Sequence, residues 1–349
     1  MATPGEPMAD RGWDSGGRRT ECAGLPSKVD VQARHEGLTC THRPIVRNES
    51  NKVNLLNREY VCARRADSYD WRVTVVAVVT GAASGIGRAT AMALGERGLT
   101  VICADVDENR AAEAGIPYGV DVGDPVAMER FATWVREEHG APAVLVNNAG
   151  IGIGGSFFDH DLADWRRTID VNLMGVVHGC LFFGPQMIER GRGHIVNVAS
   201  AAAYTPSMLL PAYGATKAGV LMLSESLRAE LSGTGVGVSA VCPGFIATGI
   251  YRAARYAGTD AAEATRRGEL AERIARRWAP GPEAAANAII RAIERDRPLV
   301  PVTAGAWGAY ALSRISPAVM RKLARAGGTD PYALAERFAG LFTHSRRPR

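Results

Sequence analysis

The sequence predicts a doubly wound α/β fold, in which helices cover both faces of a parallel sheet. From Val73 onward, short apolar runs rich in β-branched residues alternate with longer helical segments. A glycine-rich turn follows the first of these runs directly and leads into a helix. Hydrophobic residues make up 46% of the 349 residues and charged residues 22%, so the chain can bury a sizeable core.

Residues 1–70 precede this pattern and show no sustained helical or strand period. They are rich in Gly, Pro, Arg, Asn and Asp, and such a segment buries too little apolar surface to offset its ordering entropy. We therefore expect a mostly disordered extension, which is either a targeting or partner-binding arm or a stretch upstream of the natural start. The first fifteen residues lack the apolar core of a secretory signal, and the six cysteines are scattered, which favours a reduced, cytoplasmic setting.

The alternating elements occupy residues 71–305 and define the expected domain. The predicted strands span 73–79, 99–104, 116–120, 143–147, 194–199, 236–242 and 298–302. The predicted helices span 85–97, 124–139, 162–190, 207–232 and 282–294. Almost wholly apolar strands are expected when both faces of a sheet are buried, and helices between them imply crossover connections and parallel pairing. In such a sheet, ligands lie beyond the carboxyl ends of the strands.

Residues 306–349 are expected to form a helical, basic C-terminal tail. Residues 310–349 carry eight basic and two acidic side chains, whereas residues 71–309 carry 22 basic and 24 acidic side chains. The positive charge is thus confined to the tail, and no nucleic-acid partner is indicated. Helices with one apolar and one basic face pack against protein more often than against a membrane surface, so packing is favoured over membrane contact. The longest clean apolar runs are too short to cross a bilayer.

The glycine turn after the first strand is the candidate site for a dinucleotide. It reads Thr80-Gly81-Ala82-Ala83-Ser84-Gly85-Ile86-Gly87. Such a turn lets backbone N–H groups approach a pyrophosphate, and the N-terminus of the following helix favours negative charge. The second strand ends at Asp105, 18 residues after Gly87, where a carboxylate can accept hydrogen bonds from a ribose and repel a 2′-phosphate. Ser84 offers no cation to a phosphate, so NAD is favoured over NADP.

Tyr213 and Lys217 are the candidate acid/base pair. Their spacing of four residues places both side chains on one face of a helix, and only this one of the nine tyrosines has a lysine at that spacing. A phenol with an ordinary pKa of about 10 is a poor base at neutral pH, but a neighbouring ammonium and an oxidised nicotinamide favour the phenolate. Ser200 ends a predicted strand and could donate a hydrogen bond to a substrate carbonyl. The ordinary alternatives are a surface pair and a strand-end serine.

Residues from about 72 to 302 resemble the classical short-chain dehydrogenases/reductases. The resemblance rests on motifs in that family's order and spacing: Thr80-Gly81-x-x-x-Gly85-Ile86-Gly87, Asn147-Asn148-Ala149-Gly150, Asn172 in Asp170-Val171-Asn172, Ser200, Tyr213-x-x-x-Lys217, and Pro243-Gly244 with Thr248. It implies a seven-stranded Rossmann-type sheet and hydride transfer between a nicotinamide and an alcohol or carbonyl. None of these positions departs from the family pattern.

The same resemblance implies a role for each of these residues. Tyr213 would be the acid/base, Lys217 would lower its pKa and bind the nicotinamide ribose, and Ser200 would orient the reacting oxygen. Asn172 would hold a water that links Lys217 to solvent. Asp121 would lie at the adenine, Asn148 and Gly150 on the adenosine side, and Thr248 at the carboxamide. The remaining cofactor-binding residues would be Val122, Ala149, Pro243 and Gly244.

Three loops are expected to shape the substrate site, at residues 151–160, at 201–211 and in a lid at about 245–280. Many of their side chains are small, apolar or aromatic, which favours a hydrophobic alcohol or ketone such as a lipid, steroid or terpenoid-like compound. Equally, these residues could simply pack the lid against the sheet. The seven histidines and six cysteines show no metal-ligand spacing, so no metal site is expected.

The preferred function is therefore an NAD(H)-dependent oxidoreductase that interconverts a secondary alcohol and a ketone, and the family implies a homodimer or homotetramer. An NADP-dependent ketone or acyl reductase is one alternative, against which Asp105 argues. A non-catalytic NAD-binding regulator is the other. The intact catalytic set argues against it, since redox sensing alone does not require Tyr213, Lys217, Ser200 and Asn172.

Overall fold

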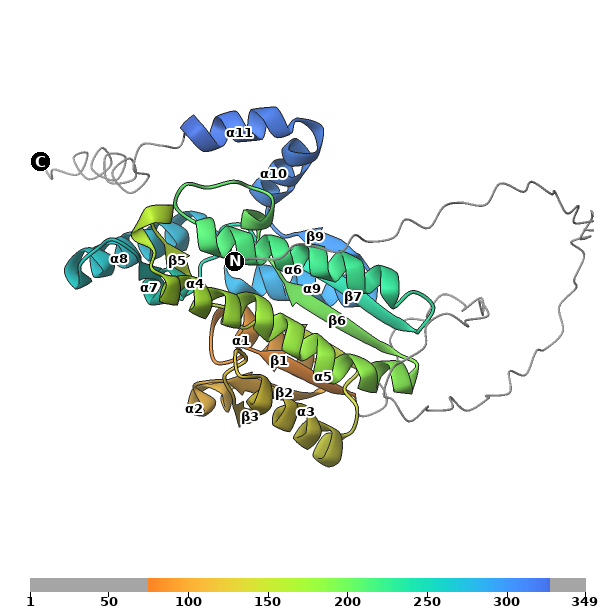
Figure 1. Ribbon diagram of the computed structural model, residues 1–349. Helices are drawn as coiled ribbons and strands as arrows, with labels where there is room; N and C mark the ends of the chain where they lie inside the picture. The colour runs from red at the N-terminus through yellow and green to blue at the C-terminus, as the bar shows by residue number, and fades with distance from the viewer. Residues whose placement is uncertain (1–74, 327–349) are drawn as a thin grey trace, which may run out of the picture. The chain divides into compact units, whose positions relative to one another are not determined.

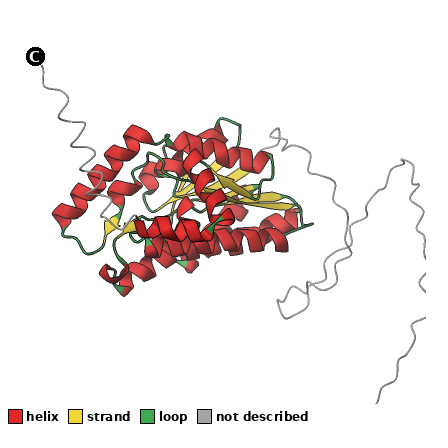
Figure 2. Cartoon of the chain, turned by 90° about the horizontal axis from the view of Figure 1, so that it is seen from above, coloured by secondary structure: helices red, strands yellow, loops and turns green. Residues whose placement is uncertain are grey.

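The computed structural model describes residues 75–326. The predicted extension, residues 1–70, and the end of the predicted tail, residues 327–349, lie outside the described residues. Within the described range, seven strands form one parallel sheet in the order β3-β2-β1-β4-β6-β7-β9, with helices on both sides (Figures 1 and 2). This arrangement confirms the doubly wound α/β fold.

The seven strands coincide with the predicted ones to within a few residues. They are β1 (Val76–Thr80), β2 (Thr100–Asp105), β3 (Ile116–Gly119), β4 (Val144–Asn147), β6 (Gly193–Val198), β7 (Val236–Cys242) and β9 (Leu299–Pro301). The chain builds outward from β1 to β3 and then returns to place β4 on the other side of β1. The carboxyl ends of β1 and β4 mark the switch point at which this architecture binds ligands, and the region beyond them is here called the crevice.

The helices that cover the sheet also follow the prediction, apart from two boundaries. They are α1 (Gly85–Gly95), α3 (Pro125–His139), α4 (Leu162–Ile169), α5 (Gly175–Arg190), α6 (Pro211–Glu230) and α9 (Pro282–Glu294). The predicted helix 207–232 begins only at Pro211, because the chain after β6 first forms a 3-10 turn, Ala201–Ala203, and a loop. The predicted helix 162–190 corresponds to one continuous helical stretch, in which a π-helical segment, Asp170–Met174, lies between α4 and α5.

The predicted lid contains elements that the sequence analysis did not foresee. They are α7 (Ile250–Ala253), β8 (Arg255–Tyr256) and α8 (Ala261–Trp278), and β8 pairs with β5 (Ile153–Gly154) in a separate two-stranded sheet. A short helix, α2 (Glu108–Ala111), follows β2. After β9, α10 (Ala304–Ile315) and α11 (Pro317–Ala326) form the described part of the predicted helical tail.

Alternation of side chains along β1 explains why the strands are almost wholly apolar. Val76 and Val78 belong to the core that also contains Phe131 of α3 and Phe183 of α5. Ala77 and Val79 belong to the core on the other face, which contains residues of α1 and α9. Successive residues of a strand point to opposite faces, and both faces are covered by helices, so both must be apolar.

One continuous helical stretch, Leu162–Arg190, has the length and apolar composition of a membrane-spanning helix. However, 61% of its apolar window is buried inside the protein. The stretch comprises α4, the π-helical segment and α5, and α5 contributes side chains to the core beneath the sheet. Such burial is typical of a central helix in a globular domain.

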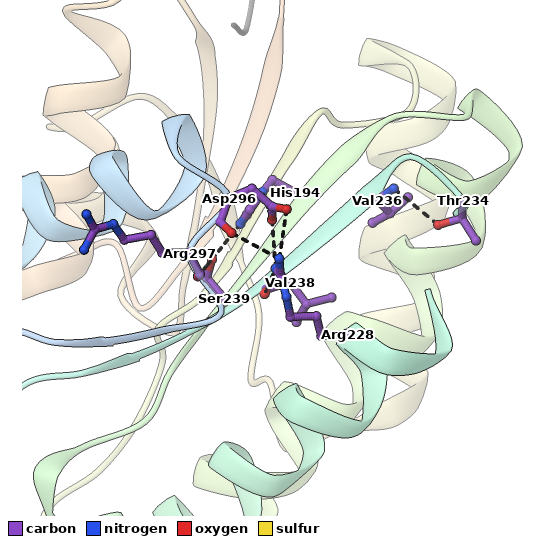
Figure 3. A network of polar contacts seen from close by, with 8 residues as sticks. All are labelled: His194, Arg228, Thr234, Val236, Val238, Ser239, Asp296 and Arg297. Carbon is purple, nitrogen blue, oxygen red and sulfur yellow. Dashed lines mark hydrogen bonds and ion pairs between the residues drawn. The ribbon is translucent and has the colours of Figure 1, made fainter. Parts of the chain in front are cut away.

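A polar network in which His194 and Ser239 are buried lies near the amino end of β6 (Figure 3). His194 Nε2 lies 2.8 Å from Ser239 Oγ, and that hydroxyl donates to the carbonyl oxygen of Arg297 at 2.6 Å, so the imidazole N–H donates to the serine. Arg228 binds both carboxylate oxygens of Asp296, at 2.8 and 2.9 Å, and the carbonyl oxygen of Val238 at 2.8 Å. These contacts hold the turn between α9 and β9 against β6 and β7.

Burial of His194 is expected to make the stability of the protein fall in mildly acidic solution. Burial disfavours the charged ring and lowers its pKa to about 4, an effect that Asp296 opposes and Arg228 adds to. The unfolded chain takes up this proton below a pH of about 6.5, so stability is full above that pH and is lost as the pH falls toward about 4, by on the order of 3 kcal/mol. Urea unfolding at about pH 7.5 and about pH 5 measures the loss.

The substitution His194→Gln removes the titrating group while keeping an N–H donor for Ser239. It should flatten this part of the pH dependence, whereas His139→Gln, at the end of α3, should leave it unchanged. An equal acid sensitivity in wild type and His194→Gln would assign the loss to other groups.

Candidate active site

The glycine turn between β1 and α1 is formed by close backbone packing. Gly81 and Gly85 have positive φ angles of 67° and 54°, which favour glycine. A Cβ atom on Gly87 would collide with the carbonyl oxygen of Gly81, so any side chain there would open the turn. The structure thus gives a steric reason for each of the three predicted glycines.

The N-terminus of α1 suits an anion. Ser84 precedes the helix in an extended conformation but makes no side-chain cap, and the first turn of the helix, which includes Ile86, contains no acidic residue. The first N–H groups of a helix have no partner within it, and the helix dipole adds partial positive charge there. The turn and helix therefore fit a pyrophosphate.

Asp105 lies beside this turn at the end of β2. Its Oδ2 accepts a hydrogen bond from the N–H of Ala83 at 2.9 Å, and its Oδ1 accepts one from the N–H of Asp107 at 3.1 Å. A carboxylate oxygen can accept more than one hydrogen bond, and Asp105 is only half-buried. The carboxylate is thus held in position and can still accept hydrogen bonds from hydroxyl groups.

Asp121 and Val122 lie beyond the end of β3. Asp121 accepts hydrogen bonds from the N–H of Gly123 at 2.9 Å and from the guanidinium of Arg167 at 2.8 Å. Burial alone would raise the pKa of Asp121, but these two donors together lower it below its usual value. Val122 is buried, and its carbonyl oxygen lies 2.8 Å from His178 Nδ1. Sequence reasoning missed Arg167, because α4 brings it from 46 residues away.

Asn148 and Ala149 tie the end of β4 to the glycine turn. The side-chain amide of Asn148 donates to the carbonyl oxygens of Thr80 at 2.9 Å and Gly81 at 3.2 Å. The hydroxyl oxygen of Thr80 accepts the backbone N–H groups of Asn148 at 3.0 Å and Ala149 at 3.1 Å. These four bonds fix the two strands on either side of the switch point.

Ser200, Tyr213 and Lys217 come together where β6 meets α6. Lys217 Nζ donates to the carbonyl oxygen of Val198 at 2.9 Å and lies 5.8 Å from the centre of the Tyr213 ring. Ser200, which follows β6, forms a hydrogen bond with the Tyr213 phenol. Its hydroxyl oxygen also accepts the N–H of Ala202 at 3.1 Å, which fixes the serine as the cap of the 3-10 turn.

Burial shifts Tyr213 and Lys217 toward their neutral forms. It raises the pKa of Tyr213, and the hydrogen bond from Ser200 only partly offsets the rise. It lowers the pKa of Lys217 to about 8. The protein by itself therefore does not produce a phenolate at neutral pH, and a further positive charge beside the phenol would be needed to favour one.

Asn172 is fully buried in the π-helical segment. Its side chain pairs with the backbone of Ile151, accepting the N–H at 2.8 Å and donating to the carbonyl oxygen at 3.0 Å. A Cβ atom on Gly150 would lie 3.2 Å from Asn172 Oδ1 and 3.5 Å from Lys217 Nζ. Residues 148–150 thus contact the glycine turn at one end and the lysine at the other.

The residues after β7 lie over the same crevice. A Cβ atom on Gly85 would lie 3.3 Å from a methyl carbon of Thr248, so Thr248 covers the glycine turn. The carbonyl oxygen of Pro243 accepts the N–H of Ala201 at 2.8 Å, next to Ser200. Gly244 packs against Thr303, the residue that caps α10.

One wall of this region comes from a helix that sequence reasoning did not place there. The hydroxyl of Tyr204, in the loop after β6, donates to the carbonyl oxygen of Ala306 in α10 at 3.1 Å. Its ring meets that of Tyr310 edge-on, with 5.4 Å between their centres. The hydrogen bond joins positions 102 residues apart, and no local pattern in the sequence signals it.

A cavity of about 270 Å³ lies between α4 and β8, beside Ile151 and Ile153. Asp164 and Arg255, which form an ion pair, also line it, whereas Ser200 and Tyr213 do not. Ile151, whose backbone Asn172 binds, is nevertheless part of its lining. Among residues 75–326, no group of three or more His, Cys, Asp or Glu side chains is arranged to hold a metal ion.

Comparisons with known sequences point to one family. Residues 75–257 match the family model described as short chain dehydrogenase. The probable oxidoreductase EphD of Mycobacterium tuberculosis is 44% identical over 261 residues, which are 71% of this chain and 44% of EphD. The chain thus spans less than half the length of that relative. The 1-deoxy-11-beta-hydroxypentalenate dehydrogenase of Streptomyces exfoliatus is 37% identical over 203 residues, 54% of this chain and 74% of that protein.

Solved structures agree with this result. A short-chain dehydrogenase from Streptomyces avermitilis superposes with a TM-score of 0.62 at 28% identity, covering 74% of this chain and 99% of that one. A short-chain dehydrogenase/reductase from Burkholderia phymatum, solved in complex with NAD, superposes with a TM-score of 0.60 at 33% identity. The match covers 68% of this chain and 92% of that one.

Proposed function

The chain belongs to the short-chain dehydrogenase family, and we propose that it is an NAD(H)-dependent oxidoreductase that interconverts a secondary alcohol and a ketone. One observation carries the proposal. Residues 148–150 bond to the glycine turn through Asn148 and lie against the ammonium of Lys217 through Gly150. The groups that suit a dinucleotide and those that suit proton transfer therefore belong to one crevice.

The residues of this crevice fit a nicotinamide dinucleotide. The N-terminus of α1 suits the pyrophosphate, and Asp105 suits the hydroxyls of the adenosine ribose while repelling a 2′-phosphate. Within the described residues, Lys217 makes one hydrogen bond, to Val198, so two of its N–H groups remain for the second ribose. The NAD bound to the Burkholderia phymatum relative supports the same class of cofactor.

The side chains of this protein would handle the proton of the reaction. When bound, the nicotinamide ring supplies the hydride acceptor or donor. In the oxidation direction, the Tyr213 phenolate would accept the proton of the alcohol hydroxyl. The carbon that bears this hydroxyl would lose a hydride at the same time and become a carbonyl carbon. Ser200 donates a hydrogen bond to the reacting oxygen and stabilises its charge. In reduction, the Tyr213 phenol returns the proton.

Lys217 and Asn172 would hold the groups around the Tyr213 phenol in position during this step. Lys217 is anchored on Val198, at the end of the strand that precedes Ser200, so its ammonium stays near the Tyr213 ring. Asn172 fixes the backbone of Ile151, next to Gly150, and thereby the surface against which the lysine lies. Both would keep the geometry of the acid/base pair constant through the cycle.

Aromatic and apolar side chains near the crevice support a hydrophobic substrate. Phe245 stacks on Tyr251 in the lid, with 5.8 Å between ring centres and 11° between planes. Tyr204, in the loop that follows Ser200, and Tyr310 of α10 add a second aromatic pair. The relative from Streptomyces exfoliatus is named for dehydrogenation of a hydroxylated compound, which supports an alcohol as the reduced substrate.

A spectrophotometric screen of secondary alcohols with NAD and with NADP tests the proposal. We expect activity with NAD, and a kcat/KM that rises about fourfold for each methylene added to the alcohol, because burial of a methylene contributes about 0.8 kcal/mol. Turnover of small polyols only would refute the apolar substrate. Higher activity with NADP would favour the alternative, a ketone or acyl reductase, and binding of NAD with no turnover would favour a regulator.

A further inference from the structure

The two helices after β9 form an exposed surface of unusual composition. Residues 304–326, here called the C-terminal helix pair, comprise α10 and α11 and contain four cations and no acidic residue. Within the described residues, Arg321, Lys322 and Arg325 are exposed and form no ion pair. The same helix pair also exposes apolar side chains, which include Trp307, Ile315, Val319 and Leu323.

The apolar side of α11 is only partly covered by protein. The sequence analysis favoured packing against protein over membrane contact, and packing within the described residues would bury the apolar side formed by Val319, Met320, Leu323 and Ala324. Met320 is buried and Ala324 is half-buried, but Leu323 is 54% exposed and Val319 is 42% exposed. In Figure 1, α11 lies on the side of α10 that faces away from the sheet. The helix thus presents an apolar edge and a basic face to its surroundings.

The C-terminal helix pair is attached directly to the candidate active site. Tyr204 binds α10 through the carbonyl oxygen of Ala306 and packs against Tyr310. The Tyr204 loop begins at Ser200, and Gly244, after β7, packs against Thr303 at the start of α10. The position of the helix pair is therefore coupled to the mouth of the crevice.

Large exposed apolar side chains also follow the four strands on this side of the sheet. Phe158 comes after β4, Met208 after β6, Phe245 after β7 and Trp307 after β9, and all four are exposed, Phe158 to 91%. These strands are neighbours in the sheet and run parallel, so their carboxyl ends lie along one edge. The segments that follow the carboxyl ends of these strands thus expose large apolar side chains.

We propose that the C-terminal helix pair docks on an anionic phospholipid surface and holds the mouth of the crevice toward that surface. Cations that form no ion pair within the described residues suit anionic headgroups, and the exposed Trp307, Ile315 and Leu323 of the same helix pair suit the boundary with the acyl chains. A nucleic acid would attract the same cations but would not favour exposed aliphatic side chains next to them. Docking would let an apolar alcohol pass from the bilayer to the crevice, and this part of the proposal rests on the proposed function. The docking itself does not depend on that function.

Co-sedimentation of the full chain with vesicles tests the docking. We expect binding to vesicles of phosphatidylcholine and phosphatidylglycerol at low salt, and little binding to phosphatidylcholine alone or at high salt. Reversing two cations in Arg321→Glu/Lys322→Glu should lower the partition coefficient at least about tenfold, since each cation near such a surface contributes about 1 kcal/mol. Val319→Ser/Leu323→Ser should weaken binding through loss of apolar contact.

The matched control reverses two exposed arginines elsewhere in the domain. Arg130→Glu/Arg291→Glu changes the net charge by the same amount, on α3 and α9, and should leave binding unchanged. NAD binding by each variant, measured without vesicles, verifies that it has folded. Three results would overturn the proposal: no sedimentation of wild type with anionic vesicles, equal loss in the control, or dissociation of a dimer by Val319→Ser/Leu323→Ser with vesicle binding intact. None of these readouts requires turnover, so a failure of docking is distinct from a failure of the proposed function.

Discussion

Replacing Tyr213 with phenylalanine is expected to lower kcat/KM by about 10²–10⁴-fold, because it removes the group that exchanges the proton in the transition state. The ring remains, so packing against Ser200 and Lys217 changes little. Binding of NAD, measured by calorimetry, should be nearly unchanged, since the anion site at α1 and the carboxylate of Asp105 do not involve the phenol. The loss should therefore lie in kcat and not in cofactor affinity.

The pH dependence of wild type should agree with this role. Burial raises the pKa of Tyr213, and alcohol oxidation requires the ionised phenol, so the oxidation rate should rise with pH. Ketone reduction requires the protonated phenol and should show the opposite trend. Tyr118→Phe is the matched control, because it removes a phenol hydroxyl at β3 while the ring keeps its contacts with Phe131 and Trp134. Full activity in Tyr213→Phe would remove the tyrosine from the mechanism.

Replacing Asp105 with asparagine is expected to shift the preference for NAD over NADP by on the order of 10²-fold, since a hydrogen bond to a charged group contributes about 1.5–3 kcal/mol. The substitution keeps the shape of the side chain and one acceptor oxygen, but it removes the charge that attracts ribose hydroxyls and repels a 2′-phosphate. Steady-state kinetics with each dinucleotide and the same alcohol measure the ratio of the two kcat/KM values.

Asp124→Asn provides the control for Asp105→Asn. The side chain of Asp124 caps α3 through the N–H groups of Val126 and Ala127 and, among the described residues, makes no hydrogen bond or ion pair with the glycine turn, so its substitution should leave the cofactor ratio unchanged. An unchanged ratio in Asp105→Asn would mean that the carboxylate serves only to hold Ala83 and Asp107 in the turn. Cofactor choice would then have to come from other residues.

Much of the candidate site could be predicted from the sequence, because its chemistry depends on short spacings. Gly81, Gly85 and Gly87 lie within a single turn, and Tyr213 and Lys217 are separated by one helical turn. The structure explains both patterns: a side chain at Gly87 would collide with Gly81, and Lys217 is anchored on Val198 near the Tyr213 ring. The direction in which the pKa of Tyr213 shifts could not be predicted from these spacings. Burial raises this pKa and the hydrogen bond with Ser200 lowers it, and both effects depend on the surrounding packing.

Contacts between distant segments could not be predicted in this way. Arg167 binds Asp121 across 46 residues, and Tyr204 binds Ala306 across 102 residues. The strands β5 and β8 have two residues each, too few for a pattern of alternation to be visible. These features follow from where α4, the lid and α10 come to rest on the domain, and no local spacing specifies that position.

The order of strands and helices, the glycine turn and the choice of Tyr213 and Lys217 as the candidate acid/base pair could be predicted from the sequence alone, because periodicity, backbone sterics and helical spacing act over a few residues. The tertiary structure decided which polar groups bond to which, how far burial shifts the pKa values of Tyr213 and Lys217, and which side of α11 is left uncovered. Each of these depends on the distance and solvent exposure of groups that the chain brings together only when it folds.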